Sequence, residues 1–195
     1  VSLIPFVRPR RLKEELNDQF RCSHPNIHYS ITLSKLRNLQ KDLRNIALEV
    51  KELEISTIAM AWAYFEKLVL GDYVHKGNRK LLAGACLVLA FKFNQHSDRP
   101  TLKQLFRCIR RLDRKDQLDQ TALRDAEMKV FVWLEFGLHL ARSAMAPHLT
   151  RMLGDLSWSF SDYYGGNAAH VLRQEWRAGG CGSCEELLGE EDVLG

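Results

Sequence analysis

Residues Arg79 to Phe93, RKLLAGACLVLAFKF, constrain the fold of this chain most. From Leu81 onward only Lys92 interrupts their apolar character. A helix that is apolar around its whole circumference must be covered by neighbours on nearly every side. Small residues at its centre, among them Gly84, would let those neighbours approach the backbone closely. The stretch therefore predicts a central helix buried inside a helical domain, with Lys92 near its end.

The size and composition of the chain fit one globular domain with tails. Its 195 residues are 46% hydrophobic and 27% charged, which is typical of such a domain. The apolar run from Leu81 to Phe91 is shorter than the roughly 20 residues that a bilayer span needs, and no apolar signal segment opens the chain. We therefore expect neither a membrane span nor secretion. The five cysteines are odd in number and show no disulfide-framework spacing, as in proteins with reduced thiols in the cytosol or nucleus.

The spacing of apolar residues predicts an N-terminal arm followed by five helices. In the arm, Leu12, Leu16 and Phe20 at fourfold spacing favour a short surface helix within residues 11–21. The five helices are expected at residues 33–50, 57–70, 79–93, 100–112 and 121–135. Polar residues at their starts predict N-caps: Thr32 for the first helix, Ser56 or Thr57 for the second and Asn78 for the third. No strand alternation of useful length occurs, so the expected class is all-α.

The chain thus divides into an arm and connector (residues 1–30), a five-helix domain (31–142) and a C-terminal part (143–195). The C-terminal part is expected to form a sixth helix at residues 143–153, which tolerates Pro147 only in its first turn. Beyond Gly154 the character of the sequence changes, and it ends in GGCGSCEELLGEEDVLG. This glycine-rich, acidic tail predicts disorder.

Histidines and cysteines predict no metal site and no cofactor. Cys181 and Cys184 form a C-x-x-C, which could be half of a zinc site or a redox pair, but no second pair lies at a suitable spacing. Cys86 and Cys108 lie on apolar helix faces and are expected to be core thiols. The seven histidines are scattered.

The charge pattern permits nucleic-acid binding but does not favour it. The net charge of +4 is mild for a nucleic-acid-binding protein. A basic run from Arg107 to Lys115 could contact phosphates, although such a run is more often a solvated helix face. Among enzyme motifs, there is no G-x-x-x-x-G-K-[ST], no G-x-S-x-G and no H-E-x-x-H, so we expect no catalytic activity.

Several blocks of the sequence resemble a cyclin box, and within that class the Cables proteins, the cyclin-dependent kinase and Abl enzyme substrates. The blocks are LKEELNDQF, TLSKLRNL, AYFEKLVL, NRKLLAGACLVLAFK and LEFGLHL, and the resemblance covers residues 10–153. It implies a single cyclin-box-like domain of five helices around a buried third, with the N-terminal helical arm.

The resemblance also implies roles for two pairs of residues. In cyclins, a lysine late in the third box helix and a glutamate in the fifth face the kinase, and these positions are Lys92 and Glu127 here. An arginine and an acid in the first two helices form an internal pair, which here would be Arg37 and Glu66. Without the resemblance, Lys92 and Glu127 could also be solvated helix residues or a surface salt bridge to each other.

The substrate-docking patch of cell-cycle cyclins lies on the first box helix. Its matching positions in this chain are Leu36, Leu39, Gln40 and Leu43. Cyclins commonly follow the lysine with F-E-E, whereas here Phe93 is followed by Asn94 and Gln95, so an acidic part of the kinase surface is missing. The second five-helix box of cyclins is at most begun by residues 143–153.

The function that the resemblance implies is that of a non-catalytic adaptor. Such a protein binds cyclin-dependent kinases and promotes their tyrosine phosphorylation by nonreceptor tyrosine kinases of the Abl or Wee type. Its consequences concern the cell cycle and division, in the nucleus and cytoplasm. The alternative is a DNA-associated helical box of the TFIIB type, which the basic run from Arg107 to Lys115 would serve.

Overall fold

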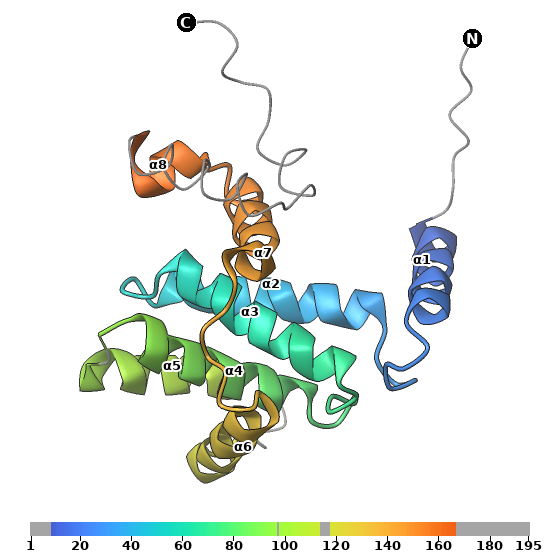
Figure 1. Cartoon of the computed structure of the whole chain (residues 1–195), viewed down its shortest axis with the longest axis horizontal. Helices are drawn as coiled ribbons and strands as arrows, with labels where there is room; N and C mark the ends of the chain where they lie inside the picture. The colour runs from blue at the N-terminus through green and yellow to red at the C-terminus, as the bar shows by residue number, and fades with distance from the viewer. Residues whose placement is uncertain (1–8, 97, 114–117, 167–195) are drawn as a thin grey trace, which may run out of the picture.

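The computed structural model describes residues 9–96, 98–113 and 118–166, and within these ranges the chain forms helices and no strands (Figure 1). The all-α prediction is confirmed. The helices are α1 (Pro9–Ser23), α2 (Leu33–Glu49), α3 (Ile55–Leu70), α4 (Arg79–Asn94), α5 (Arg99–Arg110), α6 (Gln120–Trp133), α7 (Arg142–Asp155) and α8 (Phe160–Tyr164).

Helix α4 is the buried centre of the domain, as its sequence predicts. Every residue from Leu82 to Phe91 is buried, and α3 and α6 make the most extensive contacts with this helix. A Cβ atom built on Gly84 would lie only 2.6 Å from the Cγ2 atom of Ile109 on α5. The glycine therefore allows the close helix approach that the small residues predict.

Helix α1 forms the predicted arm on the surface. None of its residues is buried, and it packs on α2 (Figure 1). The side-chain oxygen of Asn17 accepts hydrogen bonds from the backbone N–H and the hydroxyl group of Ser34, at 3.1 and 3.2 Å. A polar contact thus fixes the arm to the start of α2.

The helix starts follow the predicted caps only in part. Thr32 caps α2 by accepting a hydrogen bond from the N–H of Lys35, as predicted. Helix α3 begins at Ile55, so that Ser56 and Thr57 are buried inside it and are not its caps. Asn78 precedes α4 but makes no capping bond with it; its side chain is bonded instead to the backbone of the preceding loop. Local side-chain competition for the backbone explains this difference.

Helix α7 contains Pro147 beyond its first turn, the only turn in which the helix was expected to tolerate it. It begins at Arg142, which places Pro147 in the second turn, so the prediction of a first-turn proline is wrong. Proline has no N–H to donate, so one backbone hydrogen bond of the helix is lost there. Burial of Leu149 and Met152, which are 0% and 2% exposed, offsets this cost because α7 packs along α3.

The hydrophobic core extends past residue 142, the predicted end of the domain. It includes α7 and reaches Phe160 at the start of α8. Cys86 and Cys108 lie in the core, as predicted, and burial raises the pKa of both thiols. The C-x-x-C and the acidic tail lie outside the described residues.

Candidate functional site

Lys92 and Glu127 lie together at the surface where α4 and α6 pack. The Nζ atom of Lys92 is 2.6 Å from Oε1 and 2.8 Å from Oε2 of Glu127. The Lys92 side chain is 41% exposed, whereas that of Glu127 is only 15% exposed. The structure thus brings the two residues together, with the cation outermost and the carboxylate sheltered beneath it.

This ion pair contributes little to the stability of the domain. A partly exposed pair, whose cation is screened by solvent, is typically worth about 1 kcal/mol or less. The pair is suited to binding because the exposed ammonium group of Lys92 can still donate a hydrogen bond to another protein. Because Glu127 already balances the charge, covering Lys92 with a partner would bury a paired cation and not an isolated one.

Four large apolar side chains are exposed on the end of α4, on α6 and in the turn that follows α6. They are Phe93, Met128, Val132 and Phe136. Together with Lys92 and Glu127 we call them the α4–α6 surface. Met128 and Val132 are not among the site residues that the sequence predicts. The sequence feature that could have indicated them is their spacing of four residues. This spacing places both on the face of α6 that lies away from the buried residues Leu123, Ala126 and Val130.

A strained turn after α6 presents Phe136 at this surface. Glu135 and Phe136 have φ angles of 54° and 60°, in the left-handed region that non-glycine residues seldom adopt. This turn also ends the helix at Trp133, two residues before the predicted end. The ring of Phe136 meets that of Phe131 edge-on at 4.9 Å.

The segment after the turn is tied to the core. The hydroxyl group of Tyr64, on α3, donates a hydrogen bond of 2.5 Å to the carbonyl oxygen of Leu138. The next residue, His139, contacts Phe93, with 4.8 Å between the centres of the two rings. These two contacts hold the segment that follows Phe136 against α3 and the end of α4.

The predicted pair of Arg37 and Glu66 is not formed. In the described structure Glu66 Oε2 is instead 2.9 Å from Nε2 of His148, while the side chain of Arg37 is exposed on α2. The hydrogen bond to His148 lowers the pKa of Glu66. The partner comes from α7, which packs along α3, so it could not be inferred from the first two helices.

The predicted docking patch on α2 is not an exposed surface either. Leu39 and Leu43 are 2% and 0% exposed and belong to the core. Leu36 and Gln40 are half-buried beside them. These residues are not available for docking because the face of α2 that carries them packs into the domain.

The basic run is partly neutralised within the chain. Arg111 of this run forms an ion pair with Glu49. Asp113, an acid within the run, pairs at 3.4 Å with Lys80 of α4. Arg107 and Arg110 remain exposed, and residues 114 and 115 lie outside the described ranges. The described part of this run therefore offers fewer free cations than its sequence indicates.

Residues 9–96, 98–113 and 118–166 contain neither a metal-binding cluster nor a membrane-spanning helix. No group of three or more histidine, cysteine or acidic side chains in these ranges is placed to hold a metal ion. No helix there combines the length and the apolar character that crossing a bilayer requires.

Comparison with known proteins gives consistent matches over most of the chain. Residues 11–139 match the family described as cyclin, N-terminal domain. The chain is 40% identical over 152 residues to CDK5 and ABL1 enzyme substrate 1 of Homo sapiens, which is 78% of this chain and 23% of that protein. It is 39% identical over 151 residues to CDK5 and ABL1 enzyme substrate 2 of Mus musculus, which is 77% of this chain and 30% of that protein.

The matched part of the chain thus spans less than a third of the length of these curated relatives, 23% of one and 30% of the other. No solved structure matches it significantly.

Proposed function

Since this chain belongs to the cyclin N-terminal domain family, within which it is similar to the CDK5 and ABL1 enzyme substrates, we propose that it is a non-catalytic adaptor for a cyclin-dependent kinase. The kinase would bind to the α4–α6 surface. The bound kinase would then be presented to a nonreceptor tyrosine kinase of the Abl or Wee type, in the nucleus and cytoplasm, and so affect cell division.

The observation that carries this proposal is the combination of an exposed, already balanced cation with exposed aromatic side chains. Lys92 pairs with Glu127. Phe93, which follows Lys92 in the sequence, and Phe136, in the turn after α6, are 39% and 64% exposed. Interfaces draw most of their binding energy from a few large side chains near their centre. Strained backbone, as at Phe136, is frequent at functional sites.

The names of the relatives support the choice of partners. The relatives are named as substrates of CDK5 and ABL1, and the cyclin family fits a kinase partner. The promotion of tyrosine phosphorylation extends beyond these names and is part of the proposal.

Measured binding to a panel of purified cyclin-dependent kinases tests the proposal. We expect at least one kinase to bind, and Phe136→Ala to weaken that binding about tenfold or more, as for an interface residue of high energy. The matched control is Tyr29→Ala, since Tyr29 is 79% exposed in the connector between α1 and α2. Equal losses for both variants, or no kinase bound, would contradict the proposal.

The finer part of the proposal has its own readout. With the bound kinase and an Abl-type kinase in one assay, the chain should raise the rate of tyrosine phosphorylation of the bound kinase. Phe136→Ala should reduce this gain in step with its loss of binding. An unchanged rate despite binding would leave a kinase-binding protein that is not an adaptor for phosphorylation.

A further inference from the structure

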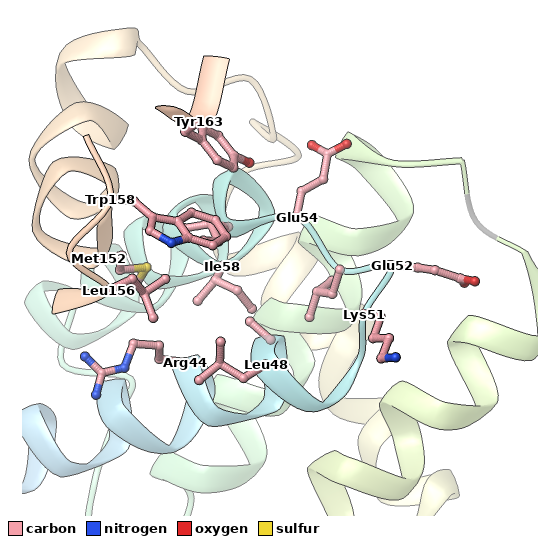
Figure 2. A pocket seen from close by; sticks show the side chains of 13 residues that line it. Arg44, Leu48, Lys51, Glu52, Glu54, Ile58, Met152, Leu156, Trp158 and Tyr163 are labelled. Carbon is pink, nitrogen blue, oxygen red and sulfur yellow. The ribbon is translucent and has the colours of Figure 1, made fainter. Parts of the chain in front are cut away.

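A groove with an apolar floor is lined by the end of α2, the start of α3 and the α7–α8 region. Helices α7 and α8 lie on the opposite side of α3 and α4 from α6 (Figure 1). The volume of the groove is about 360 Å³, and Ile58, Met152 and Leu156 line it. Leu48 and Trp158 are 58% and 49% exposed. Figure 2 shows the indole of Trp158 on one side of Ile58 and the side chain of Leu48 on the other. We call this hollow the apolar groove.

The wall that carries Trp158 is held in place by the rest of the domain. The backbone N–H of Trp158 donates to the carbonyl oxygen of Leu153 at 3.0 Å, and Ser157 takes a positive φ of 56° in the same turn. Farther along, the hydroxyl oxygen of Tyr163 accepts a hydrogen bond from the N–H of Ser56 on α3, at 3.2 Å. A wall fixed in this way lowers the ordering cost of binding.

A basic hollow of about 580 Å³ adjoins the apolar groove, with which it shares Arg44 and Met152. Five cations from three helices line it: Lys13, Arg37, Lys41, Arg44 and Arg151. The one acid in its lining, Asp155, is paired with Arg44 at 2.5 Å. The other four cations make no ion pair within the described part of the chain. The hollow therefore carries an uncompensated positive charge.

The charges differ along the combined surface. Arg44 lies at the end of the apolar groove that meets the basic hollow, whereas Glu52 lies toward the other end (Figure 2). A ligand with separate apolar and anionic parts would match both hollows at once. Lys51 lies beside Glu52 and offsets part of the charge of Glu52 and Glu54. The remaining negative charge disfavours a continuous phosphate backbone, and the aliphatic floor suits an aliphatic or aromatic side chain.

We propose that the apolar groove and the basic hollow together bind an acidic peptide segment of a partner protein. A large apolar side chain of that segment occupies the groove between Trp158 and Leu48, and its neighbouring carboxylates lie over Lys41 and Arg151. This surface is separate from the α4–α6 surface. It gives the domain a second docking site, which goes beyond the proposed kinase binding and does not depend on it.

Selection from a random-sequence peptide library, displayed on phage, tests this docking site on the full chain. Enriched peptides should combine a large apolar residue with two or more nearby acids. A synthetic copy of the most enriched peptide should bind the chain with an affinity that falls as salt rises. Replacing its acids by the corresponding amides should weaken binding tenfold or more.

Variants of the chain locate the binding. Lys41→Glu combined with Arg151→Glu, and separately Trp158→Ala, should each weaken the peptide at least tenfold. The matched controls are Arg107→Glu combined with Arg110→Glu, which makes the same charge change on α5, and Tyr29→Ala. All variants should keep the helical circular dichroism of the parent and its kinase binding, which separates this test from that of the proposed function.

Three results would overturn the proposal: enriched peptides without acids, equal binding by the groove variants and their controls, or displacement of the peptide by single-stranded oligonucleotides at lower concentration than by the free peptide. The chain itself carries acids between Glu185 and Asp192, outside the described residues. The selection is therefore repeated on a chain with Glu185, Glu186, Glu190 and Glu191 changed to glutamine. The proposal would also be overturned if neither the parent chain nor this variant enriched any peptide.

Discussion

Glu66 and Glu127 are two glutamates whose partners come from other helices. Glu127 pairs with Lys92 of α4, and Glu66 with His148 of α7. The sequence resemblance to cyclins predicts Lys92 and Glu127 as neighbouring residues, and the packing of α4 against α6 brings them together. The partner of Glu66 was predicted wrongly as Arg37, because the contact of α7 with α3 leaves no trace in the spacing of either helix.

The hydrogen bond from His148 makes stability depend on pH. It lowers the pKa of Glu66 in the folded state below the unfolded value of about 4.3. The stabilisation is therefore complete above that value and is lost as pH falls through the folded pKa. Glu66→Gln should lower the free energy of unfolding at pH 7 by up to about 1 kcal/mol, a small effect because half of the side chain is exposed.

Urea unfolding between pH 7 and pH 3 checks this prediction. The difference between parent and Glu66→Gln should shrink as the pH falls below about 4.3. The control is Glu135→Gln, which changes an exposed glutamate and should show no such trend. A difference that stays constant down to pH 3 would contradict the role of His148.

At the scale of single helices, the sequence predicts which segments are helical better than it predicts where each helix begins and ends. The all-round apolar character of residues 81–91 sufficed to place the buried helix α4. The start of α3 was missed because Ser56 and Thr57 look like caps, whereas Ser56 Oγ and Thr57 Oγ1 serve tertiary hydrogen bonds with Asn94. Pro147 was misplaced because tertiary packing outweighs its local cost.

Gly84→Ala tests the packing of α4 against α5. Alanine favours a helix interior by about 1 kcal/mol over glycine, but its Cβ would lie 2.6 Å from Ile109 Cγ2 and 3.3 Å from Leu123 Cδ1. Overpacking of this kind typically costs about 1–3 kcal/mol. We therefore expect net destabilisation in urea unfolding.

The matched control for this variant is Gly154→Ala on α7. Nothing lies within 4 Å of the Cβ that it would add, so it should leave stability unchanged or raise it slightly. The packing account would be wrong if the two variants had the same stability.

At the scale of the whole molecule, residues far apart in sequence form one core. Arg44 pairs with Asp155, and Ser56 is bonded to Tyr163. The apolar residues of α7 belong to the same cluster as those of α4. The sequence indicated a partial sixth helix, but only three-dimensional contacts show that this helix completes the domain and builds the apolar groove.

Leu149→Ala tests whether α7 is part of one cooperative unit. Leu149 is 0% exposed, and truncating a buried leucine typically costs about 2–5 kcal/mol. Helical circular dichroism and tryptophan fluorescence should report one coincident urea transition, shifted to lower concentration. Two separate transitions, with the main one unshifted, would show that α7 unfolds independently of the core.

The central claim is that Lys92 and Glu127 face a kinase, and an exchange of their charges tests it most directly. In the double variant Lys92→Glu with Glu127→Lys, the pair within the chain can form again, so helicity and stability should change little. The charge presented to the partner is reversed, and the loss of a close interfacial charge contact typically costs about 2–5 kcal/mol of binding. We predict that calorimetric binding to the kinase found in the panel weakens at least tenfold, whereas binding equal to that of the parent would contradict the account.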